Sequence, residues 1–502
     1  MTDAVAAAAA CLLLLAFWAT IHIVYNVFFH PLRRFPGPTL WAASRLPWCW
    51  YQFHGRLNHQ LLKLHVQYGH VVRVAPNELS FTSDTAWKTI YGQRSTEMGK
   101  DPVFSLHTPT GVPNILTADR QTHIRQRRLL SHAFSEKALR EQESILQTYV
   151  DKLLEQVSAR CASGAVDLVA WYNFATYDLI GDLSFGEQFG CLDKGEYDPF
   201  VRSIKAIAKE LTFMQMLKYY GLLGVRQFFL PKAVVGARAQ NMQRAMNTVD
   251  RRVQRQTDRK DFLYYILAAN DEKGMSRAEI NVNAFSLSIA GSESTATLLA
   301  GATFYILTHR DVYERLTTEI RTTFASEDDI RLSSINNLEY LDAVLTETLR
   351  IYPPVAVTLP RVVPDTPAGG EDIDGSFVPV GTTVGVNHFA CFRHPANFHQ
   401  ADSFLPERWL PDRRDQNPFD RDNRACLQPF SYGPRNCLGK NLARAEMRLI
   451  LARMLWRFDL ELDETMTSSS SSISAWHDSQ RVFGFWLKPP LMCRVTPVDR
   501  KE

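Results

Sequence analysis

The sequence predicts a mainly α-helical protein with a small β part and an N-terminal transmembrane helix. Three observations lead to this prediction: an uncharged apolar run at the N-terminus, several segments with apolar residues at helical spacing, and only a few short strand-like stretches. Of the 502 residues, 45% are hydrophobic and 22% are charged, which is a globular composition. The formal net charge of +3 gives no reason to expect nucleic acid as a partner.

The apolar run covers residues 4–29, AVAAAAACLLLLAFWATIHIVYNVFF. As a helix it is long enough to cross about 30 Å of hydrocarbon. A cleaved signal peptide, the alternative, has a basic leading region and a shorter apolar core, whereas this N-terminus carries only Asp3. Because Arg33 and Arg34 follow the run, the positive-inside rule places the body of the protein in the cytosol. We therefore expect a single-pass anchor.

A proline-rich hinge is expected at residues 30–40, because the two prolines of RFPGP cannot continue the helix. Residues 41–502 contain no internal repeat and no flexible linker, which predicts one large domain. Its expected strands are short, at 71–75 and 78–82 and in a hairpin at 373–384 that turns at Asp374 and Gly375. Its clearest helices are expected at 136–160, 235–257, 280–309, 334–352 and 438–456.

The expected helix at 280–309 holds a single formal charge, Glu293. A helix that is apolar on all sides is usually buried. Its serine, threonine and asparagine residues make it too polar for a second membrane span. Gly291, in mid-helix, costs about 1 kcal/mol relative to alanine, so a specific reason for it is expected.

The eight cysteines form no CxxC pair, which disfavours a disulfide framework or a zinc module. One of them, Cys437, lies in FSYGPRNCLG (430–439), just before the expected helix at 438–456. A helix start favours a thiolate, and Arg435 adds positive charge. Glycines such as Gly433 allow a flat ligand to approach the backbone closely. These features suit a metal ligand, although a single cysteine is more commonly an inert core residue.

The pattern FxxGxRxCxG is matched by Phe430, Gly433, Arg435, Cys437 and Gly439. Through it the chain resembles the cytochrome P450 family of haem-thiolate monooxygenases, over essentially its whole length. The most similar members are fungal microsomal enzymes of secondary metabolism, judged by RQRRLLSHAFS (125–135) and NHFACFRHPANFHQADSFLPERWL (387–410). The resemblance implies a cytochrome P450-type fold, haem b as cofactor and Cys437 as the iron ligand. Phe430 would pack beside the thiolate, and Gly433 would clear space for the macrocycle.

A second family motif is ETLR (347–350), which lies just before two prolines. Its Glu347 and Arg350 share a helical face at i,i+3 spacing. Arg408, in FLPERWL, fits the arginine that joins this pair. By resemblance these three residues form a structural network behind the haem pocket and take no part in the reaction.

The segment AGSEST (290–295) matches the acid–alcohol pair of the family's long central helix. The resemblance assigns proton delivery to Glu293 and Ser294, with Thr295 following. Serine stands where the family usually has threonine, and it lacks the methyl group that restricts the rotamer. A nearby ligand and a local opening of the helix would explain Gly291. The competing interpretation is a structural core helix whose acid is satisfied by a neighbour.

The two propionates of haem call for cationic or hydrogen-bonding partners. The resemblance assigns this role to Arg127, to His123 in the place where tryptophan is common, to Arg361 in LPRVV and to Arg435. The other two arginines of HIRQRR are expected to form a solvated basic face, namely Arg125 and Arg128.

The resemblance implies a monooxygenase that inserts one atom of O2 into a lipophilic small molecule, in a fungal secondary-metabolite pathway. Electrons are expected from NADPH through a separate NADPH–cytochrome P450 reductase, for which Lys440 and Arg444 are either a docking site or a solvated helix face. The implied location is the endoplasmic reticulum membrane, with a cytosolic catalytic domain. Two alternatives stay open: a haem-thiolate isomerase or dehydratase, which the AGSEST segment disfavours, and a non-catalytic membrane haem sensor.

Overall fold

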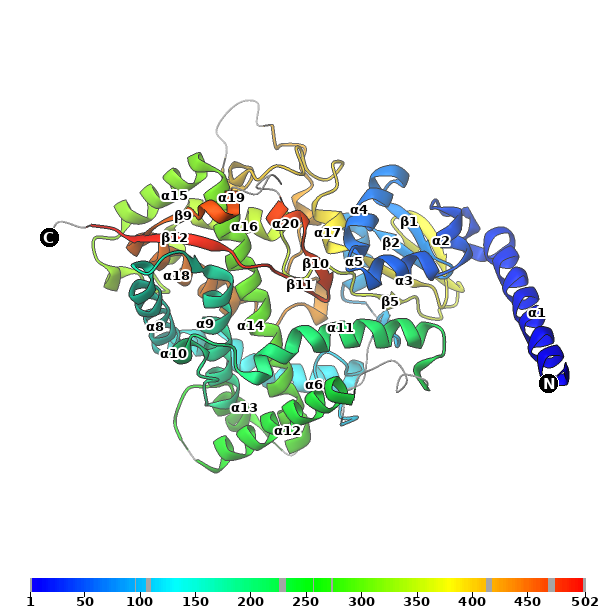
Figure 1. Ribbon diagram of the computed structural model, residues 1–502, viewed down its shortest axis with the longest axis horizontal. Coiled ribbons are helices and arrows are strands. Elements are labelled where there is room, and N and C mark those ends of the chain that lie inside the picture. The colour runs from blue at the N-terminus through cyan, green and yellow to red at the C-terminus, as the bar shows by residue number, and fades with distance from the viewer. Residues whose placement is uncertain are drawn as a thin grey trace. The chain divides into compact units, whose positions relative to one another are not determined.

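The computed structural model describes residues 2–94, 96–104, 110–224, 232–255, 257–271, 274–411, 418–467 and 475–499. The chain forms two compact units, each assembled from separate stretches. Unit 1 comprises residues 1–104, 357–401 and 421–435, and unit 2 comprises residues 105–356, 402–420 and 436–502. Long helices and short sheets make up the described residues, so the predicted mainly α fold is confirmed (Figure 1).

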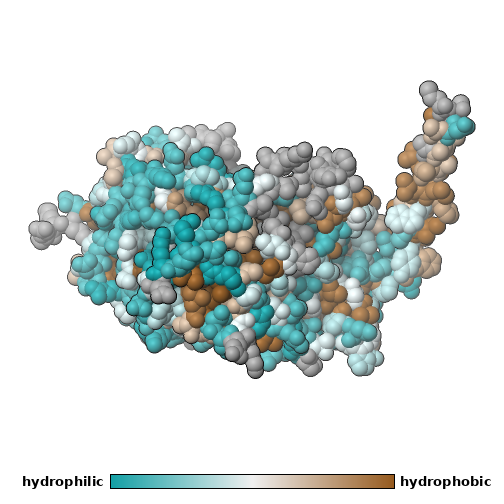
Figure 2. All heavy atoms as spheres, turned by 90° about the horizontal axis from the view of Figure 1, so that it is seen from below, coloured by the Kyte–Doolittle hydropathy of each residue, from teal (hydrophilic) through white to brown (hydrophobic). Residues whose placement is uncertain are grey.

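Unit 1 begins with an apolar helix. Helix α1 (Thr2–Val24) continues into one π-helical turn, η1 (Tyr25–Phe29). The segment Asp3–Phe29 has a mean hydropathy of 2.3 and is long and apolar enough to cross a membrane. Hydrophobic side chains cover most of its surface (Figure 2). By length and composition this helix fits the predicted membrane anchor.

The end of the anchor and the chain that follows it are held by contacts between side chains and the backbone. The Asn26 side chain donates to Ala43 O (3.0 Å), and the buried Arg73 Nη1 donates to Asn26 O (2.9 Å). Gly37 lies against Arg73, because a Cβ at Gly37 would come within 2.5 Å of the Arg73 carbonyl oxygen. The segment expected to act as a hinge is therefore fastened to the first strand of unit 1.

The main sheet of unit 1 has the strand order β1–β2–β8–β5–β3. The strands β1 and β2 lie where the sequence predicts them, and β8 pairs parallel with β2. In the antiparallel pair β3–β5, Lys100 lies opposite Arg361. The bounds are β1 (Val71–Ala75), β2 (Glu78–Phe81), β3 (Gly99–Lys100), β5 (Arg361–Val362) and β8 (Thr383–Val386).

A separate hairpin, β6 (Gly370–Ile373) and β7 (Ser376–Pro379), turns at the predicted residues. Asp374 and Gly375 both have positive φ angles, 56° and 73°, as a two-residue type I′ turn requires. The hairpin is shorter than predicted, because the chain from Thr383 joins the main sheet. The helices of unit 1 after the anchor are α2 (Thr39–Ala43), α3 (Leu46–Phe53), α4 (Leu57–Tyr68), α5 (Asp84–Tyr91) and α17 (His388–Phe392).

Unit 2 holds the long helices and two small sheets. The expected helix at 136–160 is interrupted at Gln142, and the other four predicted helices are present with small shifts of their ends. The helices are α6 (Arg120–Leu130), α7 (Glu136–Glu141), α8 (Glu143–Cys161), α9 (Leu168–Phe185), α10 (Cys191–Lys194), α11 (Pro199–Tyr219), α12 (Lys232–Gln254), α13 (Phe262–Ala269), α14 (Arg277–Thr308), α15 (Arg310–Thr323), α16 (Glu339–Ile351), α18 (Lys440–Arg457), α19 (Glu464–Thr467) and α20 (Ala475–Asp478). The sheets are β4 (Val166–Asp167), β12 (Met492–Pro497) and β9 (Phe458–Leu462), and β10 (Arg481–Phe483) with β11 (Phe485–Leu487).

Helix α14 is the core helix that the sequence predicts. It packs along α9 and also contacts α12, α16 and α18 (Figure 1). A Cβ at Gly291 would lie 3.1 Å from Ile180 Cδ1 of α9, so the glycine permits this close helix contact. The helix continues without interruption to Thr308, and the expected local opening at Gly291 is therefore wrong.

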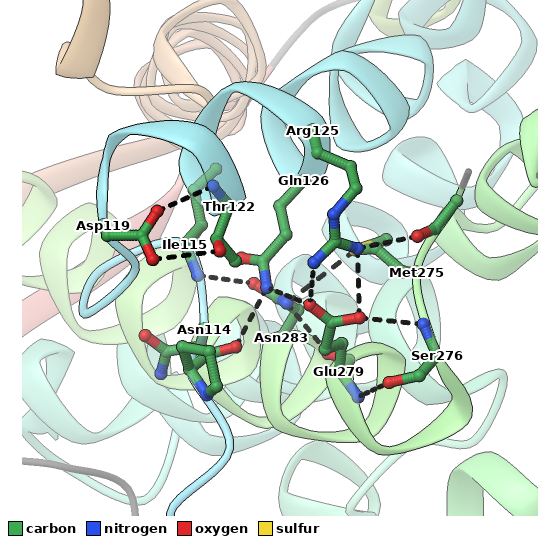
Figure 3. A network of polar contacts seen from close by, with 12 residues as sticks. Asn114, Ile115, Asp119, Thr122, Arg125, Gln126, Met275, Ser276, Glu279 and Asn283 are labelled. Carbon is green, nitrogen blue, oxygen red and sulfur yellow. Dashed lines mark hydrogen bonds and ion pairs between the residues drawn. The ribbon is translucent and has the colours of Figure 1, made fainter.

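A buried polar network holds the start of α14 (Figure 3). Ser276 and Glu279 form a capping box, in which the Ser276 N–H donates to Glu279 Oε2 (2.9 Å). Arg125 Nη2 and Gln126 Nε2 of α6 donate to Glu279 Oε1 (2.5 and 3.1 Å). The expectation that Arg125 faces solvent is wrong, because this ion pair fastens α6 to α14.

The loop before α6 joins the same network (Figure 3). Asn283 Oδ1 accepts from the Ile115 N–H (2.9 Å), and Asn114 Nδ2 donates to Ser286 Oγ (2.6 Å). Arg128 is exposed, as predicted, and it forms an ion pair with the exposed Asp271. Helix α6, which carries two of the predicted site residues, is thus fixed to α14 at its start.

The Glu279 network predicts a pH-dependent stability. Burial raises the pKa of Glu279, but hydrogen bonds from Arg125, Ser276 and Gln126 outweigh it and lower the pKa to about 2. The carboxylate therefore stabilises the folded state above its ordinary pKa of 4.5, and this contribution is lost as the pH falls towards 2. We expect Glu279→Gln to lower the free energy of unfolding by about 2 kcal/mol at neutral pH, measured by urea denaturation.

The difference between wild type and Glu279→Gln should narrow below about pH 4.5. The matched control is Glu314→Gln, because Glu314 forms an exposed ion pair with Arg310 on α15. That control should change the free energy of unfolding by less than about 0.5 kcal/mol. A deficit in Glu279→Gln that stays constant down to low pH would contradict the assigned role of the carboxylate.

Candidate active site

The cysteine motif contains a boundary between the two units along the chain. Unit 1 ends with η9 (Gly433–Arg435), and unit 2 resumes at Asn436, directly before Cys437 and α18. Cys437 is exposed, so the protein leaves room for another group at this residue. Surrounding protein raises the pKa of the Cys437 thiol by desolvation, while the Gly439 N–H, Arg127 and Lys440 act in the opposite direction.

The other cysteines are poor candidates for a metal ligand. All eight belong to the described residues, and of these only Cys11 and Cys437 are exposed. Cys11 lies in the apolar anchor helix. Cys391 and Cys426 are fully buried, and both sulfurs point at Thr82 O (3.3 and 3.7 Å). Cys437 is thus the exposed cysteine outside the anchor, whereas Cys49 and Cys161 are half-buried, and it is the cysteine that the motif predicts.

Arg127 of α6 holds the cysteine loop. Its Nη1 donates to Asn436 O (2.7 Å), and its Nη2 donates to Asn436 Oδ1 (2.6 Å). These bonds use two of the five N–H donors of a guanidinium. His123 lies one helical turn earlier and is buried. Arg127 therefore has a structural role that the sequence did not predict, besides the cofactor contact that it does predict.

Unit 1 contains a cluster of three cations, Lys100, Arg361 and Arg435. Lys100 and Arg361 face each other on β3 and β5, and Arg435 pairs with the single carboxylate of the group, Glu97. Burial lowers the pKa of Lys100 to about 7, and Arg435 and Arg361 act in the same direction. Burial also lowers the pKa of Arg361, whose guanidinium lies 5.3 Å from the ring centroid of Tyr91. Three cations with one carboxylate favour an anionic ligand.

The structure shows why a glycine is required at position 433, and the reason differs from the predicted one. Gly433 has a φ angle of 73°, and a Cβ there would lie 2.0 Å from the Tyr91 carbonyl oxygen. The residue is therefore required by the backbone of α5 in the same unit. At Gly439 a Cβ would make only ordinary contacts with Phe134. Phe430 is half-buried in unit 1, and its packing beside a thiolate stays a prediction.

Glu293 of α14 is buried, and both of its carboxylate oxygens have partners. Lys488 Nζ lies 2.5 Å from Glu293 Oε1, and the Tyr177 hydroxyl donates to Oε2 (3.1 Å). Neither partner was predicted. The only signal for Lys488 is an isolated lysine between apolar residues and two prolines, in FWLKPP. The acid is thus satisfied by neighbours, as the competing interpretation of this helix expects.

The two hydroxyl residues after Glu293 differ in their surroundings. The half-buried Ser294 donates its hydroxyl hydrogen to Ala290 O (2.6 Å), one turn back along α14. Thr295 is buried and faces Glu446 of α18. Neither carboxyl oxygen of Glu446 has a hydrogen bond of normal geometry among the described residues. Burial raises the pKa of Glu446 to about 8, and the nearby Thr295 hydroxyl only partly opposes it.

The predicted network of Glu347, Arg350 and Arg408 is confirmed. All three side chains have no accessible surface. Arg350 donates through Nη2 and Nε to the two oxygens of Glu347 (2.7 and 2.9 Å), and Arg408 Nε lies 3.4 Å from Glu347 Oε2. Trp409 Nε1 and the Leu405 N–H also donate to this carboxylate (2.8 and 3.0 Å). Burial raises the pKa of Glu347, but the two arginines outweigh it and lower the pKa.

Each unit, described by itself, holds groups whose chemistry suits a haem b. Unit 2 contributes the exposed Cys437, in a loop that Arg127 fastens and that lies beside cationic groups. Unit 1 supplies the cluster of Lys100, Arg361 and Arg435, whose charge suits carboxylate groups. A soft thiolate is a suitable ligand for iron, and cations are suitable partners for propionates.

Comparison with known proteins agrees with this donor set. The sequence model of the cytochrome P450 family matches residues 36–478. Averantin hydroxylase of Dothistroma septosporum is 42% identical over 484 residues, which cover 96% of this chain and 90% of that protein. The cytochrome P450 monooxygenase astJ of Aspergillus oryzae is 42% identical over 486 residues, covering 96% and 95%. The cytochrome P450 monooxygenase stcF of Emericella nidulans is 40% identical over 482 residues, covering 95% and 97%.

The buried Glu446 predicts a second pH effect, with the opposite sign. Its pKa in the folded protein, about 8, lies above the ordinary value of 4.5, so the folded state keeps a proton that the unfolded state has lost. Glu446 therefore lowers stability progressively as the pH rises from about 4.5 to about 8. We expect Glu446→Gln to be more stable than wild type at neutral pH, by about 2 kcal/mol in urea denaturation.

This gain should be small near pH 5 and largest at or above about pH 8. Glu155→Gln is the matched control, because Glu155 is exposed on α8 and its substitution should be neutral at every pH. A Glu446→Gln variant whose stability relative to wild type does not change with pH would show that this carboxyl is ionised in the folded protein.

Proposed function

The chain belongs to the cytochrome P450 family, and from this premise we propose that Cys437 is the iron ligand of a haem-thiolate monooxygenase. The protein is an oxygen-incorporating oxidoreductase with haem b as its cofactor, similar to fungal monooxygenases of secondary metabolism. The observation that carries the proposal is the exposure of Cys437, the cysteine of the family's motif. When bound, a thiolate-ligated haem supplies cleavage of the O–O bond and insertion of oxygen into the substrate.

The protein's own groups would hold the cofactor by charge and geometry. Arg127 fastens the Cys437 loop through Asn436, which limits movement of the ligating sulfur. The cations Arg361 and Arg435 would bind propionates, as would Arg127 and His123. We add Lys100 to this set, because it lies opposite Arg361 in the sheet register. Binding a carboxylate would also restore the charged form of this lysine, which burial disfavours.

We propose that Glu293, Ser294 and Thr295 serve proton delivery. The Ser294 hydroxyl hydrogen is engaged with Ala290 O, so its oxygen has lone pairs left to accept a hydrogen bond. Glu293 lies next to it in sequence and is the only formal charge between residues 280 and 309. A carboxylate and an adjacent hydroxyl are the types of group that pass protons in general acid catalysis.

The family implies a reductase partner and a lipophilic substrate. We infer NADPH–cytochrome P450 reductase as the partner, with Lys440 and Arg444 at the start of α18 as its docking residues. We further infer that residues 4–29 anchor the protein in the endoplasmic reticulum membrane. The hinge at 30–40 would then connect the anchor to one haem-binding domain, residues 41–502. Averantin, named in one relative, is the first substrate to test.

The ligand assignment is tested by a spectrum. We expect the reduced protein with carbon monoxide to give the red-shifted Soret band of a thiolate-ligated haem. Cys437→Ala should abolish this band, because it removes the proposed ligand, and no other described cysteine outside the anchor is exposed. Cys161→Ala, on the half-buried end of α8, is the control and should retain it. An imidazole-type spectrum of the wild type, or retention of the band in Cys437→Ala, would overturn the assignment.

The role of Ser294 is tested by the coupling of NADPH consumption to product formation. We expect Ser294→Ala to raise the hydrogen peroxide released per NADPH several-fold, because a missing hydroxyl misdirects protons. The measurement uses full-length protein with reductase in lipid vesicles. Ser294→Thr, which keeps the hydroxyl, should match or improve on wild type. Equal peroxide release from Ser294→Ala and wild type would exclude a role of this hydroxyl in proton delivery.

A further inference from the structure

A buried ion pair joins α14 to the segment that follows β11. Lys488 Nζ contacts Glu293 Oε1 (2.5 Å) and Thr297 Oγ1 (2.6 Å). The Lys488 side chain has no accessible surface, and that of Glu293 is 7% exposed. Two prolines follow Lys488, and Trp476 Nε1 donates to the carbonyl oxygens of both, Pro489 (3.3 Å) and Pro490 (3.2 Å). The lysine therefore projects from a segment with restricted backbone freedom.

Glu293 is held from two sides. Lys488 binds Oε1 from the C-terminal segment, while the Tyr177 hydroxyl binds Oε2 from α9. Because each oxygen has a partner on a different element, rotation of the carboxylate would break at least one bond. The neighbouring Ser294 hydroxyl is bonded to Ala290 O and takes no part in this arrangement. The acid and the alcohol of α14 are thus positioned independently.

The ion pair is not needed to bury α14. Removing two charges from water has a large desolvation cost, and well-packed apolar side chains of similar volume commonly give equal or greater stability. The rest of this helix between residues 280 and 309 is packed without any formal charge. Burial lowers the pKa of Lys488, and the exposed Lys205 lowers it as well. Glu293 raises the pKa of this lysine. A charged pair at this position is better explained by control of Glu293 than by stability.

We propose that Lys488 is a positioning residue that keeps Glu293 ionised and fixes its carboxylate for proton delivery. The proposal rests on the proposed function, which assigns proton delivery to Glu293. With Lys488 present, a proton that reaches Glu293 Oε1 competes with the lysine for that oxygen. Without Lys488, the buried carboxylate has a single neutral donor, Tyr177, and neutralises by taking up a proton from water.

The other titratable groups around this pair do not interfere in the neutral range. Glu293 interacts electrostatically with three tyrosines: Tyr177 of α9, Tyr197, and Tyr352, which directly follows α16. Burial raises the pKa of Tyr197 to about 12 and raises the pKa of Tyr177 and of Tyr352 further. Lys205 of α11 is the nearby exposed cation. Because Glu446 on α18 titrates in the neutral range, a proton taken up after removal of Lys488 is assigned to Glu293 where Glu293→Gln abolishes the uptake.

The first test measures protonation directly, by infrared spectroscopy of the full-length haem-loaded protein at neutral pH. Lys488→Met should gain the carbonyl stretch of a protonated carboxylic acid, and Lys488→Met/Glu293→Gln should lack this added band. Glu446 contributes its own protonated band to every sample, so the result is read as the difference between these two variants. Lys488→Arg keeps the cation and should match wild type.

Lys488→Gln is the second variant, because it keeps a hydrogen-bond donor of similar polarity but removes the charge. It should gain the same Glu293-dependent band, and it serves in place of the methionine variant if that protein fails to fold. The absence of a Glu293-dependent band in the folded charge-removing variant would overturn the proposal, because Glu293 would then be ionised without Lys488.

The second test measures function, as NADPH-dependent hydrogen peroxide release against pH in reductase-containing lipid vesicles without added substrate. The pH midpoint should shift by about one unit or more in Lys488→Met, and Lys488→Arg should restore it. Lys488→Met should add no further shift when Glu293 is already glutamine. Shifts that add in the double variant would overturn the proposal, because Lys488 would then act independently of Glu293.

The carbon monoxide spectrum distinguishes a failure of the proposed function from a failure of the role assigned to Lys488. If wild type lacks the thiolate Soret band, the proposed function fails. If wild type and all variants show the band and no variant shows Glu293-dependent protonation, only the role of Lys488 fails.

Discussion

The burial of α14 is the constraint on which the arrangement of unit 2 depends. A helix of 32 residues that is mostly buried needs neighbouring elements to provide partners for its charged groups and for most of its polar groups. Its start is satisfied by α6 through Arg125 and Glu279, and its middle by Lys488 and Tyr177 through Glu293. Each contact fixes a neighbouring element against the helix. The polar residues of α14 thus order the elements that carry the candidate site.

Charge in the candidate site is organised in the same way. Arg127 is positioned by α6, and it donates two hydrogen bonds to Asn436 beside Cys437, one to the backbone and one to the side chain. In unit 1, the short β3–β5 pair sets Lys100 opposite Arg361. A rigid cationic group loses little conformational entropy when an anion binds, so such groups favour a cofactor with carboxylates. In each unit, the cations are thus held in place by defined secondary-structure elements.

Motifs and periodicity in the sequence predicted the fold class, the helices and the Glu347–Arg350–Arg408 network. These depend on residues close in sequence or on a pattern that the family repeats. The sequence did not predict Lys100, Glu446 or Lys488. Each becomes significant only through a partner far along the chain, and an isolated lysine or glutamate has no distinctive local pattern. Gly291 and Gly433 were recognised as special, but their neighbours, Ile180 and the Tyr91 backbone, are visible only in the folded chain.

Both carboxylate oxygens of Glu293 have partners, and this arrangement is compatible with both interpretations of α14: a structural core helix and a helix that delivers protons. A buried acid must be paired or neutral for the fold to tolerate it, and Lys488 with Tyr177 provides that pairing. A proton carrier must also exchange partners, and an ion pair with one cation on one oxygen offers a single defined contact to break. The same bond can therefore satisfy the resting helix and set the condition for proton movement. Glu293 can therefore be both a structural acid of this helix and the acid of the proposed function.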